Sequence, residues 1–260
     1  MKFGKAPLGP ATELSVIIPA YNEAARILPC LTEMSTFLGG RNRPYEILVV
    51  DDGSRDGTAP VVEEFRRTHA AVRLLRLARN TGKGGAIRRG IQEARGEWLL
   101  LADADGATPF PELTRLEASI GAGADIAIGS RALAARDSRY RVEAHWHRTA
   151  LGNLFNWVVR RLGIRDISDT QCGFKLFRRA VAQDLFSVAW VDGYGFDLEI
   201  LYVAQRRGYR ISEVPVNWAD QPGSKVRVLR DGPRMLGDLL AVRRRYARGR
   251  YSPQAMIPHH

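Results

Sequence analysis

The chain has 260 residues, of which 45% are hydrophobic and 26% charged, and its formal net charge is +11. This length and composition fit one large globular domain and exclude wholesale disorder. The sequence has no apolar run near the ~18 residues of a membrane span, no apolar core of a secretory signal behind Met1 and only 2 cysteines, which predicts a cytoplasmic protein without a transmembrane segment.

Short apolar runs rich in β-branched residues divide the first half of the chain. They predict strands at 14–19, 46–51, 72–77, 98–103 and 125–130. Helices are expected between them: one over 23–38, a second opened by the turn residues 53–58, and a third after the glycine-rich segment 80–90. Strands that alternate with helices predict a mainly parallel, doubly wound sheet of the nucleotide-binding type.

The second half alternates less regularly. The pattern predicts helices over 143–163, 196–207 and 233–247, strands over 174–179 and 211–218, and a loop over 166–173. The expected division of the chain is a loose tail 1–11, one globular domain 12–226, a basic amphipathic helix 227–250 and a tail 251–260.

The excess positive charge is concentrated in two segments. Residues 131–161 hold seven arginines and two acids, residues 227–250 hold eight arginines and two acids, and the rest of the chain is neutral overall. Two local basic patches favour an anionic partner, such as a phosphorylated substrate, phospholipid headgroups or nucleic acid. A solvated surface is the alternative.

Acidic residues follow two of the predicted strands directly. Asp51 and Asp52 end one strand, and Asp103-Ala104-Asp105 ends another. Ligands of an open parallel sheet bind beyond the carboxyl ends of its strands, and crowded carboxylates repel each other unless a cation lies between them. Helix capping is the alternative role for such residues. In an extended chain, residues two apart point to the same side, so Asp103 and Asp105 are suited to hold Mg²⁺ or Mn²⁺.

The segment Asn80-Thr81-Gly82-Lys83-Gly84-Gly85 is rich in glycine but lacks the spacing of a Walker loop. It offers close backbone approach, a helix N-terminus and one cation, which suit a phosphate or nucleotide. A tight turn with a solvated lysine is the alternative. Because the chain has no GxGxxG motif, a dinucleotide cofactor is not expected.

The motifs VIIPAYNE, VVDDGSRDGT, NTGKGGAI, DADGATP, GSR and DTQCGFKLF occur in this order. The order resembles the inverting family-2 glycosyltransferases, and most of all those members that transfer glucose from UDP-glucose to dolichyl phosphate. The resemblance runs from about Leu14 to Tyr246. It implies an α/β, Rossmann-like GT-A fold for nucleotide-diphospho-sugar transferases, with a mainly parallel sheet flanked by helices.

The resemblance also implies a role for each matched residue. Residues expected to bind the nucleotide sugar are Pro19, Ala20, Tyr21, Asn22, Glu23, Asp51, Asp52, Gly53, Asn80, Lys83, Gly84, Asp103, Ala104, Asp169 and Gln171. The metal ligands would be Asp103 and Asp105, and the acceptor phosphate would meet Arg131, Arg148, Ser224 and Lys225. Asp105, Arg131 and Arg148 are the expected catalytic residues of this set.

The acceptor decides whether the reaction needs a base. A hydroxyl acceptor needs one at neutral pH, whereas a phosphate monoester, with a second pKa near ~6, is already anionic and needs orientation by cations. Asp197 and Glu199 are further catalytic candidates as the base, with structural pairing on the helix as the alternative.

Three features depart from relatives. The mannosyltransferase relatives carry a glutamine as a further metal ligand where this chain has Ala107, so water or phosphate oxygens would complete the metal shell. Eukaryotic glucosyltransferase relatives begin with a membrane-spanning helix, which this sequence does not show. The QxxRW motif of processive polysaccharide synthases is also absent.

Together these observations predict a metal-dependent enzyme that moves glucose from UDP-glucose to a polyprenyl phosphate at the inner face of the cell membrane. The basic helix would hold it on an anionic membrane surface, with packing of that helix onto the core as the alternative. Alternatives for the function are a soluble acceptor, transfer of mannose from GDP-mannose to polyprenyl phosphate, and a nucleic-acid-binding module. Nucleic acid is not expected as a partner, because the carboxylates at the strand ends would repel it.

Overall fold

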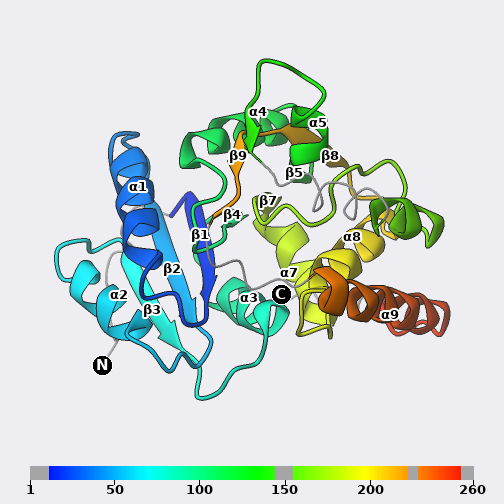
Figure 1. Cartoon of the computed structure of the whole chain (residues 1–260), viewed down its shortest axis with the longest axis horizontal. Coiled ribbons are helices and arrows are strands. Elements are labelled where there is room, and N and C mark those ends of the chain that lie inside the picture. The colour runs from blue at the N-terminus through cyan, green and yellow to red at the C-terminus, as the bar shows by residue number, and fades with distance from the viewer. Residues whose placement is uncertain (1–11, 144–154, 222–227, 253–260) are drawn as a thin grey trace, which may run out of the picture.

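The computed structural model describes residues 12–143, 155–221 and 228–252. Over these residues the chain forms a central seven-stranded sheet flanked by helices (Figure 1). The strand order is β3-β2-β1-β4-β7-β5-β8. β7 runs antiparallel to both of its neighbours, β4 and β5, whereas the other pairs are parallel. The mainly parallel sheet predicted from the sequence is therefore confirmed.

The strands predicted in the first half are present as β1 (Leu14–Ala20), β2 (Tyr45–Asp51), β3 (Val72–Arg76), β4 (Trp98–Leu101) and β5 (Ile126–Ser130). In the second half, the expected strands appear as β7 (Lys175–Arg178) and β8 (Ile211–Pro215). The predicted strand 211–218 is not continuous, because Trp218–Ala219 (β9) pairs with Val142–Glu143 (β6) in a separate two-stranded sheet.

The helices of the first half are α1 (Ile27–Gly39), α2 (Thr58–Arg66), α3 (Lys83–Glu93), the short 3₁₀ helix η1 (Phe110–Glu112), α4 (Leu113–Gly121) and α5 (Arg131–Ala134). The helix expected over 23–38 begins only at Ile27, because Asn22 has a positive φ of 51° and a turn over 24–26 precedes the helix. α4 was not predicted.

The helices of the second half are α7 (Arg179–Val188), α8 (Phe196–Arg206) and α9 (Val228–Ala247). α7 was not predicted, and the helix expected over 143–163 is confirmed only over 155–161, because Glu143 belongs to β6 and 144–154 lie outside the described residues. Among the described helices, none is both long and apolar enough to span a bilayer.

Each face of the sheet packs against its own group of helices. Alternate residues of β1 show this, because Ile17 belongs to the core cluster that includes residues of α3, α7, α8 and α9, whereas Val16 and Ile18 belong to the cluster with residues of α1, α2 and α4. β1 to β3 lie on the left of Figure 1 and α7 to α9 on the right. The sheet lies between the two groups of helices, and the carboxyl ends of its parallel strands lie at one edge.

The apolar residues of α9 face the protein. Met235, Leu239 and Val242 are buried in the core beside α8, while Leu240 is exposed. Of the two alternatives for the basic helix, packing onto the core is therefore confirmed. The contact of this basic helix with an anionic membrane surface stays a prediction.

Candidate active site

A cavity of about 1320 Å³ opens at the carboxyl ends of β1, β2 and β4. Most of the predicted site residues surround it, although they come from distant parts of the chain. The predicted residues that line it are Pro19, Ala20, Tyr21, Glu23, Asp52, Asn80, Lys83, Asp103, Ala104, Asp105, Arg131, Asp169, Gln171 and Asp197. The carboxyl edge of a parallel sheet is where such a site is expected.

Some predicted site residues do not line this cavity. These are Asn22, Asp51, Gly53, Gly84 and Glu199. Arg148, Ser224 and Lys225 lie outside the described residues. Asp51 is buried and accepts a bond from the backbone N–H of Ser54 at 3.0 Å, so its carboxylate shapes the turn after β2. The Asn22 side chain likewise accepts a bond from the N–H of Arg55.

Asp103 and Asp105 follow β4 and occupy different electrostatic settings. The Lys83 ammonium lies 2.6 Å from Oδ1 of Asp103. Burial alone would raise the pKa of Asp103, but the charge of Lys83 holds it below its usual value. Burial and then the charge of Asp103 raise the pKa of Asp105, whose Oδ2 lies 3.9 Å from the guanidinium of Arg26. The two carboxylates thus crowd each other.

Asp52 organises the glycine-rich loop. Its Oδ1 accepts bonds from the N–H and the hydroxyl of Thr81, both at 2.7 Å, and its Oδ2 accepts one from the N–H of Gly82 at 2.8 Å. The carboxylate therefore holds the start of α3, and with it Lys83, beside the strand ends. Its expected contact with the uridine stays a prediction.

Gly84 does not face the cavity, and a glycine is required there because the backbone of another segment packs directly against it. A Cβ atom there would lie 2.3 Å from the carbonyl oxygen of Val191, and its N–H donates to the carbonyl of Asp192 at 2.7 Å. The close approach joins the start of α3 to the segment 190–195, of which Gly193 and Tyr194 line the cavity.

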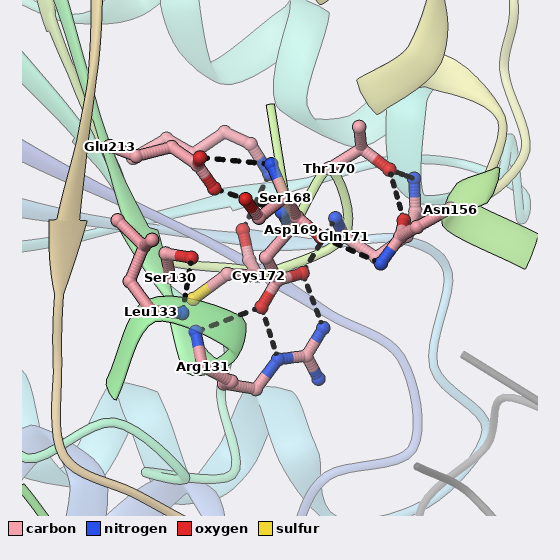
Figure 2. A network of polar contacts seen from close by, with 11 residues as sticks. Ser130, Arg131, Leu133, Asn156, Ser168, Asp169, Thr170, Gln171, Cys172 and Glu213 are labelled. Carbon is pink, nitrogen blue, oxygen red and sulfur yellow. Dashed lines mark hydrogen bonds and ion pairs between the residues drawn. The ribbon is translucent and has the colours of Figure 1, made fainter. Parts of the chain in front are cut away.

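Arg131 is held in a fixed orientation at the start of α5. Its Nε and Nη2 donate to the two carboxylate oxygens of Asp169 at 2.7 and 2.8 Å, and its backbone N–H donates to the same group at 3.0 Å (Figure 2). The guanidinium carbon lies 5.2 Å from the ring centre of Trp218. Burial alone would lower the pKa of Arg131, but Asp169 raises it, so the cation is fixed.

Asp197 and Glu199 point to opposite sides of α8, as residues two apart on a helix do. Asp197 lines the cavity and pairs with the buried Lys175 at 2.6 Å, and burial raises its pKa. Glu199 accepts bonds from the N–H groups of Trp190 and Val191 and from the Tyr251 hydroxyl. The prediction of Glu199 as a base is therefore wrong, and the structural alternative holds for it.

The comparisons with known proteins agree with this geometry. Residues 15–186 match the family Glycosyl transferase family 2. The chain is 43% identical over 253 residues to the dolichyl-phosphate beta-glucosyltransferase of Drosophila melanogaster, with 92% of this chain and 77% of that protein covered. The chain belongs to glycosyl transferase family 2. The human dolichyl-phosphate beta-glucosyltransferase is 40% identical, with coverage of 92% and 78%.

The fold comparison is consistent with the family. The glucosyl-3-phosphoglycerate synthase of Mycobacterium tuberculosis, solved with Mn²⁺ and uridine-diphosphate-glucose, superposes with a TM-score of 0.65 at 20% identity, over 89% of this chain and 79% of that one. The GT-A fold expected from the sequence is confirmed. This family-2 glycosyltransferase is an enzyme, and the alternative of a nucleic-acid-binding module is wrong.

The acidic pair of this glycosyltransferase fits a divalent metal ion. Asp103 and Asp105 offer the oxygen ligands that Mg²⁺ and Mn²⁺ prefer, and a cation would relieve their mutual repulsion. Over 12–143, 155–221 and 228–252, no three His, Cys, Asp or Glu side chains are grouped to hold a metal. The two aspartates would therefore hold it together with ligands from outside the protein, and the expectation from Ala107 that these are water or phosphate oxygens stays a prediction.

Several residues of the glycosyltransferase site were missed from the sequence. They include Arg26, Gly173, Lys175, Tyr194, Glu213 and Trp218, which line the cavity or hold residues that do. Gly173 and Lys175 lie inside the motif DTQCGFKLF, in which the resemblance gave roles only to Asp169 and Gln171. No pattern in the sequence around Glu213 indicates its role, because the residues it contacts are 44 and 45 positions away.

Proposed function

We propose that this glycosyltransferase transfers glucose from UDP-glucose to a dolichyl-type polyprenyl phosphate, with inversion at the anomeric carbon. The observation that carries the proposal is the single cavity that unites the acidic pair Asp103 and Asp105 with the cations Lys83 and Arg131. A site for one small ligand measures roughly 300–1,000 Å³, so a cavity of about 1320 Å³ has room for a donor and an acceptor headgroup together.

The donor end lies over the carboxyl ends of β1, β2 and β4. Tyr21 and Asn80 line it beside the glycine-rich loop, and Lys83 presents a cation where a diphosphate would lie next to the acidic pair. Mg²⁺ or Mn²⁺ held by Asp103 and Asp105 would neutralise charge on the UDP leaving group. The relatives' names and the neighbour solved with UDP-glucose and Mn²⁺ support this donor and this metal.

The acceptor end is suited to a phosphate. A phosphate monoester is already anionic at neutral pH and attacks without a general base. Arg131 offers it a rigid cation. Asp197 is held by Lys175, and Glu199 lies outside the cavity, so neither carboxylate is placed as an unpaired base. Dolichyl-phosphate beta-glucosyltransferases at 38–43% identity support a lipid phosphate as the acceptor.

A lipid acceptor places the enzyme at a membrane surface. Since Met235, Leu239 and Val242 of α9 are buried, its exposed arginines are the main groups that remain to contact anionic headgroups. We therefore propose electrostatic, peripheral association through this helix at the inner face of the membrane.

The purified protein tests the proposal directly. With UDP-glucose, dolichyl phosphate and Mn²⁺, we expect inverted glucosyl dolichyl phosphate and UDP as products. Asp105→Asn should lower the rate by about 100-fold or more while leaving the melting temperature within a few degrees, because it removes the negative charge of one of the two carboxylates that would hold the metal. Mn²⁺ titration should show the matching loss of affinity.

Control reactions separate the alternatives. GDP-mannose in place of UDP-glucose, and water-soluble alcohols in place of dolichyl phosphate, should give no comparable turnover. Faster transfer from GDP-mannose, or to a soluble alcohol, contradicts the proposed donor or acceptor. Full activity of Asp105→Asn contradicts the metal site.

A further inference from the structure

Glu213 supports the site without lining the cavity. It lies on β8, and its two carboxylate oxygens accept bonds from the backbone N–H groups of Ser168 and Asp169, both at 2.9 Å (Figure 2). One carboxylate thus fixes two successive amides of the loop that precedes β7. Because two successive amides are bound to one carboxylate, the orientation of the loop backbone at Asp169 is restricted.

Asp169 transmits this orientation to Arg131. Its carboxylate is buried, at 3% exposure, and accepts bonds from Nε, Nη2 and the backbone N–H of Arg131. Asp169 also accepts a bond from the N–H of Gln171 at 3.2 Å. The paired geometry needs the two planar groups to be coplanar, so a rotation of Asp169 would break one of the two side-chain bonds.

The pair leaves one amino group of Arg131 for a ligand. Nε and Nη2 are bound to Asp169 and Trp218 covers the guanidinium, whereas Nη1 has no hydrogen-bond acceptor among the described residues. Arg131 itself lines the cavity. The orientation of Asp169 therefore decides where this remaining donor of Arg131 points.

We propose that Glu213 is a positioning residue for the transfer reaction: it sets Asp169, which clamps Arg131 so that the guanidinium meets the acceptor phosphate. The identity of that phosphate rests on the proposed function. Asn156 holds the same loop from the other side, since its Nδ2 donates to the carbonyl of Ser168 at 2.8 Å. The loop therefore keeps a second anchor when Glu213 is changed.

Glu213→Gln is the sharpest variant. The side chain keeps its size, but it has one acceptor oxygen instead of two, and its amide NH₂ would face a backbone N–H. One of the two loop amides then lacks an acceptor. Glu117→Gln is the matched control, because Glu117, which lies on α4 away from the cavity, also accepts two bonds, in its case from the guanidinium of Arg41.

The first measurement needs no substrate. Hydrogen exchange at Nε–H of Arg131, followed by ¹⁵N NMR, should be slow in the wild-type protein, since this hydrogen is bound to Asp169. We expect exchange about tenfold or more faster in Glu213→Gln and unchanged exchange in Glu117→Gln. Equal protection in wild type and Glu213→Gln overturns the proposal.

The second measurement uses a double-mutant cycle with Arg131→Ala. Glu213→Gln alone should raise the KM for dolichyl phosphate by roughly 10- to 100-fold, the usual effect of a supporting partner, and leave the KM for UDP-glucose within about twofold. In the Arg131→Ala background the same change should have little further effect. Fully additive effects, or an unchanged acceptor KM, overturn the positioning role.

The two measurements separate this proposal from the proposed function. A wild-type protein that transfers no glucose to dolichyl phosphate contradicts the proposed function. In that case exchange at Arg131 still decides whether Glu213 sets the pair with Asp169. A melting temperature for Glu213→Gln like that of Glu117→Gln shows that the effect is not general unfolding.

Discussion

Single residues around the cavity are fixed by close backbone approach as well as by charge. A Cβ atom at Gly173 would lie 2.0 Å from Oδ2 of Asp103, closer than two such atoms can be. The loop before β7 therefore passes directly over the first aspartate of the acidic pair. The side chain of Asp103 is confined between this glycine and the ammonium of Lys83.

Gly173→Ala should therefore disable the site with little effect on the fold. The added methyl group must displace the Asp103 carboxylate, and misplacement of a reacting-site group by about 1 Å costs on the order of 100-fold in rate. The measurements are the rate of glucosyl transfer and a Mn²⁺ titration. Gly121→Ala is the control, since a Cβ there meets nothing within 4 Å. A Gly173→Ala enzyme as active as this control contradicts the predicted role of Asp103.

Some residues of the site could be predicted from the sequence and others could not. Asp103 and Asp105 were predicted because their spacing and the apolar strand before them are local features. Glu199 was misassigned, because the sequence does not show that its side chain faces Trp190 and Val191 rather than the cavity. Glu213 was missed because its function depends on a loop 44 residues away, which only the folded sheet brings to it.

At the scale of elements, one buried carboxylate joins three strands at the end of the sheet away from the cavity. Glu46 on β2 accepts bonds from the Ser15 hydroxyl on β1 at 2.6 Å, from Arg73 on β3 at 2.5 Å and from the N–H of Arg95 at 2.6 Å. Burial alone would raise the pKa of Glu46, but Ser15, Arg73 and the Arg95 N–H together hold it below its usual value.

Glu46→Gln should lower the free energy of unfolding at pH 7 by about 1.5–3 kcal/mol, the range for hydrogen bonds to a charged group. Because the folded-state pKa of Glu46 is lowered, its contribution is present above the unfolded-state pKa and is lost as the pH falls through the folded-state value. Urea unfolding between pH 7 and pH 3 measures this. The difference between wild type and variant should shrink toward low pH, and a constant difference contradicts the assignment.

Elements were predicted best where the hydrophobic pattern is local. The strands of the first half follow from short apolar runs, and all of them are present. The direction of β7 was not predictable, because an antiparallel strand between β4 and β5 has the same apolar pattern as a parallel one. The β6–β9 pair was missed because each strand has only two residues, too few for a periodicity.

For the whole molecule, the net charge of +11 is distributed unevenly. α9 and α2 lie on opposite sides of the molecule in Figure 1, and both carry exposed arginines. At the end of α2, Arg66 and the following Arg67 are paired with Glu63 and Glu64. The exposed arginines near the end of α9 belong to a segment with a large positive excess, so this side of the molecule is the one that an anionic surface attracts.

The distribution of charge yields a prediction for membrane binding. Replacing Arg243 and Arg244 of α9 with glutamine should weaken binding to phosphatidylserine vesicles by roughly 30-fold, since each arginine near such a surface contributes about 1 kcal/mol. Replacing Arg66 and Arg67 at the end of α2 removes the same charge and should have a much smaller effect. Co-sedimentation at 50 and 300 mM salt measures both, and binding should fall at the higher concentration because salt screens exposed charges. Met235, Leu239 and Val242 are buried, so the exposed arginines of α9 are expected to dominate its contact with lipid. Equal losses for the two pairs would therefore mean that net charge, and not α9, governs association.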